Sequence, residues 1–510
     1  MTRADRIAII LCLLGVLGAY LVHERVFERM AHLEDEMAYV WQAQVMARGN
    51  LTLSSPPNPN SFLVPFVVDY DGLRFGKYPL AWPALLAVGI NLGIRGLVNP
   101  LLAGVGVWLT YRLGKRTFSE LVGLLAAGLT VTSPFFLMNS GSLLSHPLGL
   151  VLSAGFALAW LNAFGNARSS RTWLYPILAG VSLGILAITR PMTAIGVGLP
   201  FAIHGLYLLI SKDWGTRLQV LVVGGIALSI GSLQFVWQFI ATGDPFFNLY
   251  TLWWEYDKIG FGPGHGVLPE GHSLRQAITT TRQTLQRTHE DIFGWWKLSW
   301  VFLPFGLVAI FKNRVRRLDG LLVSSVFFSL LAVYLIYWIG AFLYGPRYYY
   351  EGFYSLTILS AAGMALLAGW PYRPEDRWVP KEGWERVRSI GAGALLILLV
   401  GYNLIFYTPS RLGEMHGLYG VERTHTEPFQ TPLAQALTPA LVIVHPQEEW
   451  IEYGTLIELS SPYLDTPFIF VLTRGPAADA IVIRAFPDRN VLHYYPDEPH
   501  NFYTAPRPET

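Results

Sequence analysis

The chain has 510 residues, of which 52% are hydrophobic and 14% charged, and its mean hydropathy is +0.37. An average soluble domain carries roughly 25% charged residues, so this composition excludes an ordinary soluble enzyme and indicates a polytopic membrane protein. The net charge of +2, carried by scattered basic residues, excludes a nucleic-acid-binding surface, and the lone Cys12 excludes a disulfide framework and a cysteine metal site.

The first element is an apolar segment at the N-terminus, from Ile7 to Val22. Arg3 and Arg6 precede this segment, as basic residues precede the apolar part of a signal peptide. The residues that follow are His23-Glu-Arg25, which do not form a small-residue cleavage site. We therefore expect an uncleaved signal anchor that forms the first membrane span.

Further apolar segments are near the length that a bilayer core requires, which predicts about eleven transmembrane helices in all. They lie at residues 7–22, 98–113, 120–139, 147–164, 173–189, 192–210, 218–240, 299–311, 320–340, 354–370 and 389–406. Short basic loops between these spans alternate with aromatic loops of mixed charge, at 23–97, 140–146, 241–298 and 341–353. Because basic loops stay inside, we expect a cytoplasmic N-terminus and an extracytoplasmic C-terminal segment, in the plasma membrane of a prokaryote.

Residues 79–98 form a competing span, because this stretch is apolar too. Its interior carries Asn91 and Arg95, and counting it as a span would place every later basic loop outside. We therefore expect a helix that lies in the outer interface of the membrane, with Trp82 as its anchor.

Acidic residues follow the first span in the tetrapeptide Leu33-Glu34-Asp35-Glu36. Carboxylates near a bilayer are costly to desolvate and tend to be functional. They can also cap the short helix that the apolar spacing predicts from Met37 onward, since a helix dipole favours acidic residues at its N-terminus. The functional alternative is a general base for a hydroxyl or amine acceptor, or a metal ligand.

Basic residues in the outer loops are candidates for binding a phosphate. Lys77 precedes the interfacial helix and can contact a donor phosphate or ordinary lipid phosphates. Arg347 lies in a Gly-Pro-Arg-Tyr stretch and can hold a phosphate through two parallel hydrogen bonds, beside Tyr348. Arg190 lies on the outer side, where the fifth and sixth spans meet. His146, which opens the fourth span, is a metal ligand, a substrate contact or an interfacial polar residue.

The outer loop 241–298 carries His265, His272 and His289, whose spacing does not match that of a metal site. We expect these histidines at the protein surface. The aromatic residues of the loop, such as Trp253 and Trp254, favour a loop that lies on the membrane near a lipid chain.

The C-terminal segment 407–510 differs in kind from the membrane part, 1–406. Short apolar runs at Ala440–His445, Phe468–Thr473 and Ala480–Ala485 are separated by Pro, Gly and Asp, which is typical of buried strands. We expect a small extracytoplasmic α/β or β domain of about 100 residues.

Short motifs in a fixed order carry a resemblance to a known family. They are Asp35-Glu36, Lys77 to Leu80, Arg112 to Phe118, Thr189 to Pro191, and Gly345 to Tyr348. Over residues 5–410 the chain resembles the GT-C membrane glycosyltransferases, and within them the branch of the protein O-mannosyltransferases and lipid A aminoarabinose transferases. The resemblance implies the GT-C fold and a sugar donor linked to a polyprenyl phosphate.

The resemblance also implies roles for individual residues. Asp35, paired with Glu36, matches the catalytic carboxylate, and Lys77 matches the residue near the donor phosphate. Arg347 is a looser match, as a phosphate or substrate contact. The chain departs from the pattern at His146, where relatives often have Asp before Pro. The acceptor, which is a lipid, a glycan or a protein, and the use of a divalent cation therefore stay open.

Two other classes of function compete with a glycosyltransferase. A transporter or flippase would carry inverted repeats and polar residues at the middle of its spans, whereas this chain shows no repeat and has its charges at span ends. A receptor or scaffold would use the spans only to present residues 407–510 outside. The sequence has no nucleotide-binding glycine motif, which agrees with a lipid-linked donor.

Overall fold

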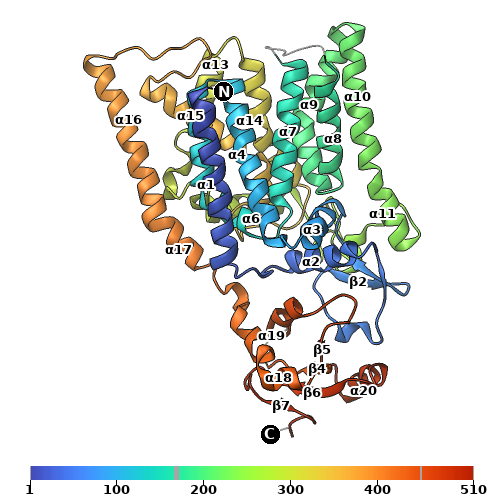
Figure 1. Cartoon of the computed structure of the whole chain (residues 1–510). Helices are drawn as coiled ribbons and strands as arrows, with labels where there is room; N and C mark the ends of the chain where they lie inside the picture. Colours follow the sequence, from blue (N-terminus) through green and yellow to red (C-terminus); the bar gives the residue numbers. More distant parts are fainter. Residues whose placement is uncertain (1, 166–171, 448–450, 509–510) are drawn as a thin grey trace. The chain divides into compact units, whose positions relative to one another are not determined.

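The computed structural model describes residues 2–165, 172–447 and 451–508 (Figure 1). Its contacts divide the chain into two compact units. The first, here called the helical unit, comprises Met1–Val22, Leu97–Val236 and Glu255–Leu412. The second, here called the α/β unit, comprises His23–Gly96, Trp237–Trp254 and Gly413–Thr510. Each unit is described by itself. The predicted division of the chain between residues 406 and 407 stays a prediction.

The helical unit consists mostly of apolar helices of different lengths. They are α1 (Arg3–Arg25), α4 (Val98–Thr117), α5 (Glu120–Val131), α6 (Pro134–Gly141), α7 (His146–Phe164), α8 (Leu174–Ala187), α9 (Pro191–Ser211), α10 (Trp214–Gly231), α12 (Leu274–Thr288), α13 (Leu303–Lys312), α14 (Arg317–Tyr334), α15 (Phe353–Ala368) and α16 (Gly383–Tyr402). Helix α11 (Leu233–Thr242) crosses into the α/β unit, and α17 (Thr408–Gly413) ends at its border. This composition confirms a helical polytopic membrane protein.

Every expected span coincides with a helix, but the helices differ in their capacity to cross a bilayer. Within the described residues, seven are long and apolar enough, or eight if the bent pair α5 and α6 counts as one span. The helices α4, α8 and α13 are shorter or less apolar. A count of about eleven spans therefore stays a prediction.

The expected span 120–139 is broken rather than continuous. Its halves, α5 and α6, meet at an angle of 60°. Ser133 ends the first half, because its hydroxyl accepts a hydrogen bond from the Phe136 amide at 3.2 Å and caps the next helix. Pro134 fits the first turn of α6, where a missing amide hydrogen costs nothing, but it cannot continue α5.

Two helices, α7 and α15, form the buried centre of the helical unit. The spans that contain them are 78% and 89% buried, whereas the span of α10 and α11 is only 11% buried. Glycines permit the close packing of α13 on α15: a Cβ atom added to Gly306 would lie 2.2 Å from the Leu359 carbonyl oxygen. The side chains at the start of α7 and just before α15 are therefore shielded from lipid.

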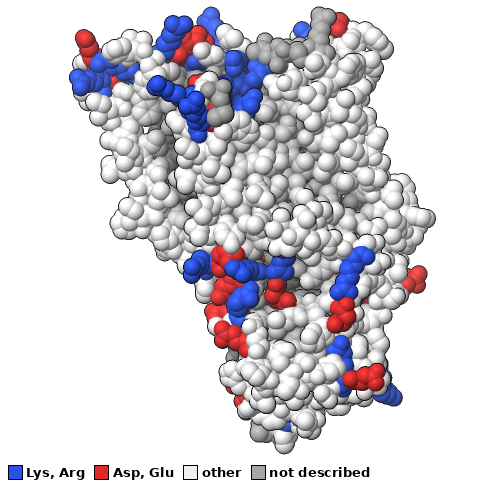
Figure 2. All heavy atoms as spheres, in the orientation of Figure 1, with Lys and Arg blue, Asp and Glu red and all other residues white. Residues whose placement is uncertain are grey.

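Charge is unevenly distributed on the helical unit. Figure 2 shows charged side chains gathered at the end of this unit from which α16 begins, and a nearly uncharged surface along the helices. Such a surface suits lipid contact.

The first part of the α/β unit joins two helices to a small antiparallel sheet. The elements are α2 (Glu34–Ala47), β1 (Leu53–Ser54), β2 (Val67–Tyr70), β3 (Leu73–Gly76) and α3 (Ala81–Asn91). The strand order is β1-β3-β2, with Asp71 and Gly72 at positive φ in the hairpin turn. The Gln42 side chain accepts a hydrogen bond from the Gly76 amide at 2.8 Å and so ties α2 to the end of β3.

Helix α3 lies within the segment 79–98 and is among the shorter apolar helices. Trp82 is 0% exposed, so the expectation that it anchors this helix in lipid is wrong. Its ring fills the interior of the protein, because apolar packing between α2 and α3 outweighs exposure of the ring to an interface.

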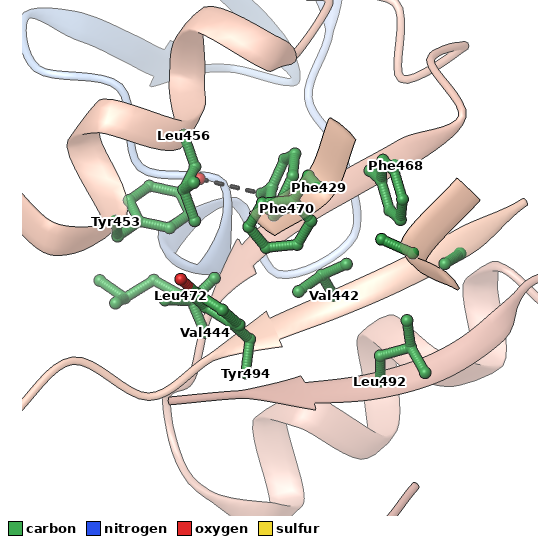
Figure 3. Close-up of a cluster of buried hydrophobic side chains, with 12 residues drawn as sticks. Phe429, Val442, Val444, Tyr453, Leu456, Phe468, Phe470, Leu472, Leu492 and Tyr494 are labelled. Carbon is green, nitrogen blue, oxygen red and sulfur yellow. Dashed lines mark hydrogen bonds between the residues drawn. The ribbon is translucent and has the colours of Figure 1, made fainter. Parts of the chain in front are cut away.

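The C-terminal part of the α/β unit is a small α/β sheet, as expected. Strands β4 (Ala440–Val444), β5 (Phe468–Leu472) and β6 (Asn490–Tyr494) are parallel, and β7 (Phe502–Tyr503) pairs antiparallel with β6, in the order β5-β4-β6-β7. Alternate residues of β4 pack toward different helices. Val442 and Val444 join the cluster around Phe429 and Tyr453 (Figure 3), whereas Leu441 and Ile443 pack with the helix that precedes β6.

One predicted strand of this sheet is wrong. Residues Ala480–Ala485 belong to helix α20 (Pro476–Ala485), and β6, which the sequence did not predict, supplies the third parallel strand. The apolar run is not buried on both sides: Val482 is 0% exposed, but Ile481 is 46% exposed. Pro476 at the first helical turn is the local signal for a helix.

Candidate functional site

The acidic tetrapeptide forms the start of α2, as the capping interpretation predicted. Leu33 precedes the helix and cannot cap it with its side chain. Glu36 performs this function instead: its Oε2 accepts hydrogen bonds from the backbone amides of His32 (2.7 Å) and Leu33 (3.2 Å). Glu36 is 1% exposed. The structure thus gives Glu36 a role in positioning the turn that carries Asp35.

Asp35 lies beside Tyr78, the neighbour of Lys77 in the sequence. The Tyr78 hydroxyl donates a short hydrogen bond to Oδ1 of Asp35. Burial, reinforced by the nearby Asp35 charge, raises the pKa of Tyr78 well above its usual range, so this hydroxyl keeps its proton. A partly exposed carboxylate is thereby held in one orientation, next to the strand end that carries Lys77.

Lys77 directly follows β3 and is 2% exposed. Its backbone amide donates to the Phe66 carbonyl oxygen at 3.0 Å, and its Nζ lies 3.9 Å from the centre of the Phe66 ring. The two predicted residues of the first loop are therefore linked through Tyr78 within one unit. This juxtaposition of a carboxylate and a cation is the first candidate site.

The second group of predicted residues lies in the helical unit and is organised by a buried acid, Glu351. Its Oε1 accepts a hydrogen bond from His146 Nδ1 at 3.0 Å and forms an ion pair with Arg190, whose Nε lies 3.1 Å away. Glu351 is 0% exposed and His146 is 2% exposed. The start of α7, the residue that precedes α9 and the segment before α15 are thus tied together.

Glu351 is a residue that the sequence interpretation did not select. It ends the tyrosine-rich stretch that begins at Arg347, in the 3₁₀ segment Arg347–Gly352. Gly149, one turn along α7 from His146, leaves room for it: a Cβ atom added there would lie 2.7 Å from Cγ and Oε1 of Glu351. The sequence signal that could have identified Glu351 was a single acidic residue within a tyrosine-rich stretch at the start of an expected span.

Arg190 and Tyr348 are joined through a tyrosine of α14. Arg190 NH1 donates to the Ser145 hydroxyl at 3.2 Å, and its NH2 lies 3.4 Å from the Tyr334 hydroxyl. The Tyr334 ring stacks on Tyr348 with ring centres 4.9 Å apart. Tyr348 thereby lies in the same network as Arg190.

The structure therefore groups the predicted residues into two sets, one in each unit. Asp35, Glu36 and Lys77 form one set, whereas the other contains His146, Arg190, Arg347 and Tyr348. A single site made of both sets stays a prediction. Within the described parts of the chain, no group of three or more His, Cys, Asp or Glu residues is arranged to hold a metal ion.

One histidine of the outer loop is not at the surface. His272 is 4% exposed, its Nε2 lies 2.9 Å from the Leu335 carbonyl oxygen, and its ring stacks on Phe261. The expectation of an exposed His272 is therefore wrong. Its hydrogen bond to the end of α14 compensates for burying the imidazole.

A cavity of about 270 Å³ lies within the α/β unit. Residues of α2 and of the C-terminal segment both line it, among them Trp41, Gln44, Arg74, Tyr453 and Tyr463. The first loop and the C-terminal segment thus line one cavity, on the same helix that carries Asp35 at its start.

Comparison with known proteins gives a partial sequence match and a nearly complete match of fold. The profile of a family described as dolichyl-phosphate-mannose-protein mannosyltransferase matches residues 84–237, which is less than half of the chain. No curated protein sequence matches the sequence of this protein. The structure is similar to that of ArnT from Cupriavidus metallidurans bound to undecaprenyl phosphate, with 12% identity and a TM-score of 0.58, over 95% of this chain and 89% of that one.

A second similarity is to the oligosaccharyltransferase of Archaeoglobus fulgidus in its apo form. The identity is 12% and the TM-score 0.51, over 95% of this chain and 69% of that chain. The same archaeal protein, AglB, in complex with an inhibitory peptide and a dolichol-phosphate, gives 11% identity and a TM-score of 0.51, over 94% and 69% of the two chains. These similarities extend over nearly the whole sequence, and we conclude that the chain has the GT-C fold of membrane glycosyltransferases.

Proposed function

We propose that the protein is a glycosyltransferase that moves a sugar from a polyprenyl-phosphate donor to an acceptor on the extracytoplasmic face of the plasma membrane. The observation that carries this proposal is the link between Asp35 and Lys77 through Tyr78. The reaction needs both a base and a cation for the leaving phosphate. Solved structures of two proteins of similar fold contain undecaprenyl phosphate and a dolichol-phosphate, which supports a lipid phosphate as the carrier.

The chemistry follows from these two groups. The acceptor hydroxyl or amine gives its proton to Asp35 as its oxygen or nitrogen attacks the anomeric carbon. The bond between that carbon and the phosphate oxygen breaks, and its electron pair leaves with the phosphate, whose charge Lys77 stabilises. A single displacement of this kind inverts the anomeric centre. The Tyr78 hydroxyl holds Asp35 in one orientation, and Glu36 holds the turn on which Asp35 lies.

The residues of the helical unit have supporting roles in the proposal. Arg347 is the second candidate contact for the phosphate. His146, Arg190 and Tyr348 bind substrate, with Glu351 fixing the orientation of His146 and Arg190. The N-terminus lies in the cytoplasm, and residues 407–510 lie outside. A hexose and a pentose donor are both compatible with these residues, as are lipid, glycan and protein acceptors.

The substitution Asp35→Asn tests the proposal. In proteoliposomes supplied with a polyprenyl-phosphate sugar, we expect sugar transfer to fall by about 10²–10⁴-fold, the usual contribution of a general base. Glu34→Gln is the matched control, because Glu34 lies in the same helical turn and carries the same charge. Both variants should unfold at the temperature of the wild-type protein. Full activity of Asp35→Asn would remove Asp35 from the role of base.

A further inference from the structure

Four aromatic rings surround the ammonium group of Lys77. Its Nζ lies 3.9 Å from the ring centre of Phe66, 4.9 Å from that of Trp254, 5.1 Å from that of Tyr250 and 5.4 Å from that of Tyr78. All four distances lie within the range of cation–π attraction, which extends to about 6 Å. The ammonium of Lys77 is thus enclosed by an aromatic cage, a name used below for these four rings.

The rings of the aromatic cage come from segments that are far apart in the sequence but lie in one compact unit. Phe66 precedes β2, and Tyr78 follows Lys77. Tyr250 and Trp254 belong to the segment Trp237–Trp254. Edge-to-face contacts hold the rings against one another: Phe66 and Trp254 are 5.3 Å apart, and Tyr78 and Tyr250 are 5.6 Å apart. The cage is therefore a packed assembly rather than a chance approach of one ring.

Phe66 occupies its place in the cage at a conformational cost. Its φ angle is +61°, in the left-handed region that residues other than glycine rarely adopt. The surrounding contacts keep it there: its carbonyl oxygen accepts the Lys77 amide hydrogen, and its ring lies beneath the Lys77 Nζ. Backbone strain of this kind persists where the structure requires a particular side-chain position, and it clusters at functional sites.

Aromatic faces stabilise a cation in a way that suits a phosphate-binding lysine. Their negative quadrupole offsets part of the cost of removing the ammonium from water. A ring brings no negative charge, so the rings do not compete with an anion for the ammonium. The rings also exclude water, which strengthens the attraction between this charge and an anion.

We infer that Phe66, Tyr250 and Trp254 are positioning residues that hold the Lys77 ammonium for the phosphate of the lipid-linked donor. This inference rests on the proposed function and adds to it that the segment Trp237–Trp254 controls donor affinity through Lys77. Tyr250 and Trp254 act by the position and polarisation of their rings, so another aromatic ring should replace them.

Binding of undecaprenyl phosphate without a sugar tests this inference apart from catalysis. The full chain is placed in nanodiscs, and lipid binding is measured for Tyr250→Leu and Trp254→Leu against Tyr250→Phe and Trp254→Phe. We expect each leucine variant to bind about 10-fold more weakly, the loss of one desolvated cation–π contact. The phenylalanine variants should remain within about 3-fold of the wild type, because they keep a ring.

A second set of variants separates positioning from a merely structural role. In a Lys77→Met background, Trp254→Leu should cause no further loss of lipid binding, because the ring acts through the missing ammonium. If Trp254→Leu weakened lipid binding equally with and without Lys77, the inference would be overturned. Wild-type lipid binding by both leucine variants would also overturn it. Wild-type binding by Lys77→Met itself would instead overturn the assignment of Lys77 in the proposed function. Thermal unfolding of each variant establishes that the chain is folded.

Discussion

Each unit of the molecule holds a cationic side chain, Lys77 in the α/β unit and Arg190 in the helical unit, but the two units stabilise it in different ways. In the α/β unit, aromatic faces surround Lys77 and add no opposing charge. In the helical unit, the buried carboxylate of Glu351 accepts a hydrogen bond from His146 and forms an ion pair with Arg190. Rings place no charge of their own beside a ligand, whereas the carboxylate of Glu351 joins helices through an ion pair. Substituting the rings should therefore change donor binding more than stability, whereas substituting Glu351 should change stability more than donor binding.

The largest expected effects come from substitutions at Lys77, which should reduce sugar transfer, and at Glu351, which should reduce stability. Lys77→Met should reduce sugar transfer by about 10²–10³-fold, the loss of one group that stabilises transition-state charge, with little change in unfolding temperature. Glu351→Ala should lower the free energy of unfolding by about 3–5 kcal/mol, because it leaves the partly buried Arg190 without its carboxylate and the buried His146 ring without its acceptor. Transfer assays and thermal unfolding of both variants measure the contrast.

Glu351→Gln is the control for this contrast, because it removes the charge but keeps the shape and an acceptor oxygen. Its loss of stability should be smaller than that of Glu351→Ala. If Glu351→Ala unfolded at the wild-type temperature and yet transferred no sugar, Glu351 would have a role in sugar transfer rather than in stability. The distinction between the two units would then fail.

A smaller effect is expected at Gly149, which makes room for Glu351. A Cβ atom at this position would lie 2.7 Å from the glutamate side chain, so Gly149→Ala should cost about 1–3 kcal/mol by overpacking. Gly155→Ala is the matched control on the same helix, since its nearest neighbour would be the Ser182 hydroxyl at 3.7 Å. It should be neutral, or stabilising by up to about 1 kcal/mol. Equal unfolding temperatures for the two variants would show that the Glu351 side chain can move aside for the added methyl group without loss of stability.

The smallest effect concerns pH and a histidine pair in the C-terminal sheet. His445 Nε2 lies 2.8 Å from His493 Nδ1, at the ends of two parallel strands. Burial lowers the pKa of both imidazoles, and the neighbouring His493 lowers that of His445 further. The unfolded chain thus binds protons at higher pH than the folded one, near a pKa of about 6.5.

The contribution of this histidine pair to the free energy of unfolding is therefore fully present above about pH 6.5. It is lost as the pH falls toward the lower pKa values that the two histidines have in the folded chain. Unfolding temperatures of the full chain at pH 7.5 and 5.5 measure the change, and the double variant His445→Asn, His493→Asn should reduce it. Binding of undecaprenyl phosphate by the folded protein should be unaffected, since neither histidine is part of the aromatic cage. An unchanged pH dependence in the double variant would contradict the role of the pair.

Local sequence signals were sufficient where one short segment determines the outcome. Each expected span falls on helical residues, although 120–139 is broken into two helices, because transfer of some 20 apolar residues into a bilayer needs no partner from elsewhere. The acidic tetrapeptide predicted the start of α2 for a similar reason, since helix capping is a contact between close neighbours. The same local reasoning failed at Ala480–Ala485, where a short apolar run fits a helix as well as a strand.

Sequence alone thus determined the membrane class, the GT-C fold and the residues worth testing, through hydropathy and ordered motifs. Only the tertiary structure decided their partners. Asp35 and Tyr78 are 43 residues apart, and His146 and Glu351 are 205 apart. The rings around Lys77 likewise come from separate segments. Such contacts form only because packed helices and strands bring distant residues together, and the identity of a residue does not specify which distant residue will face it.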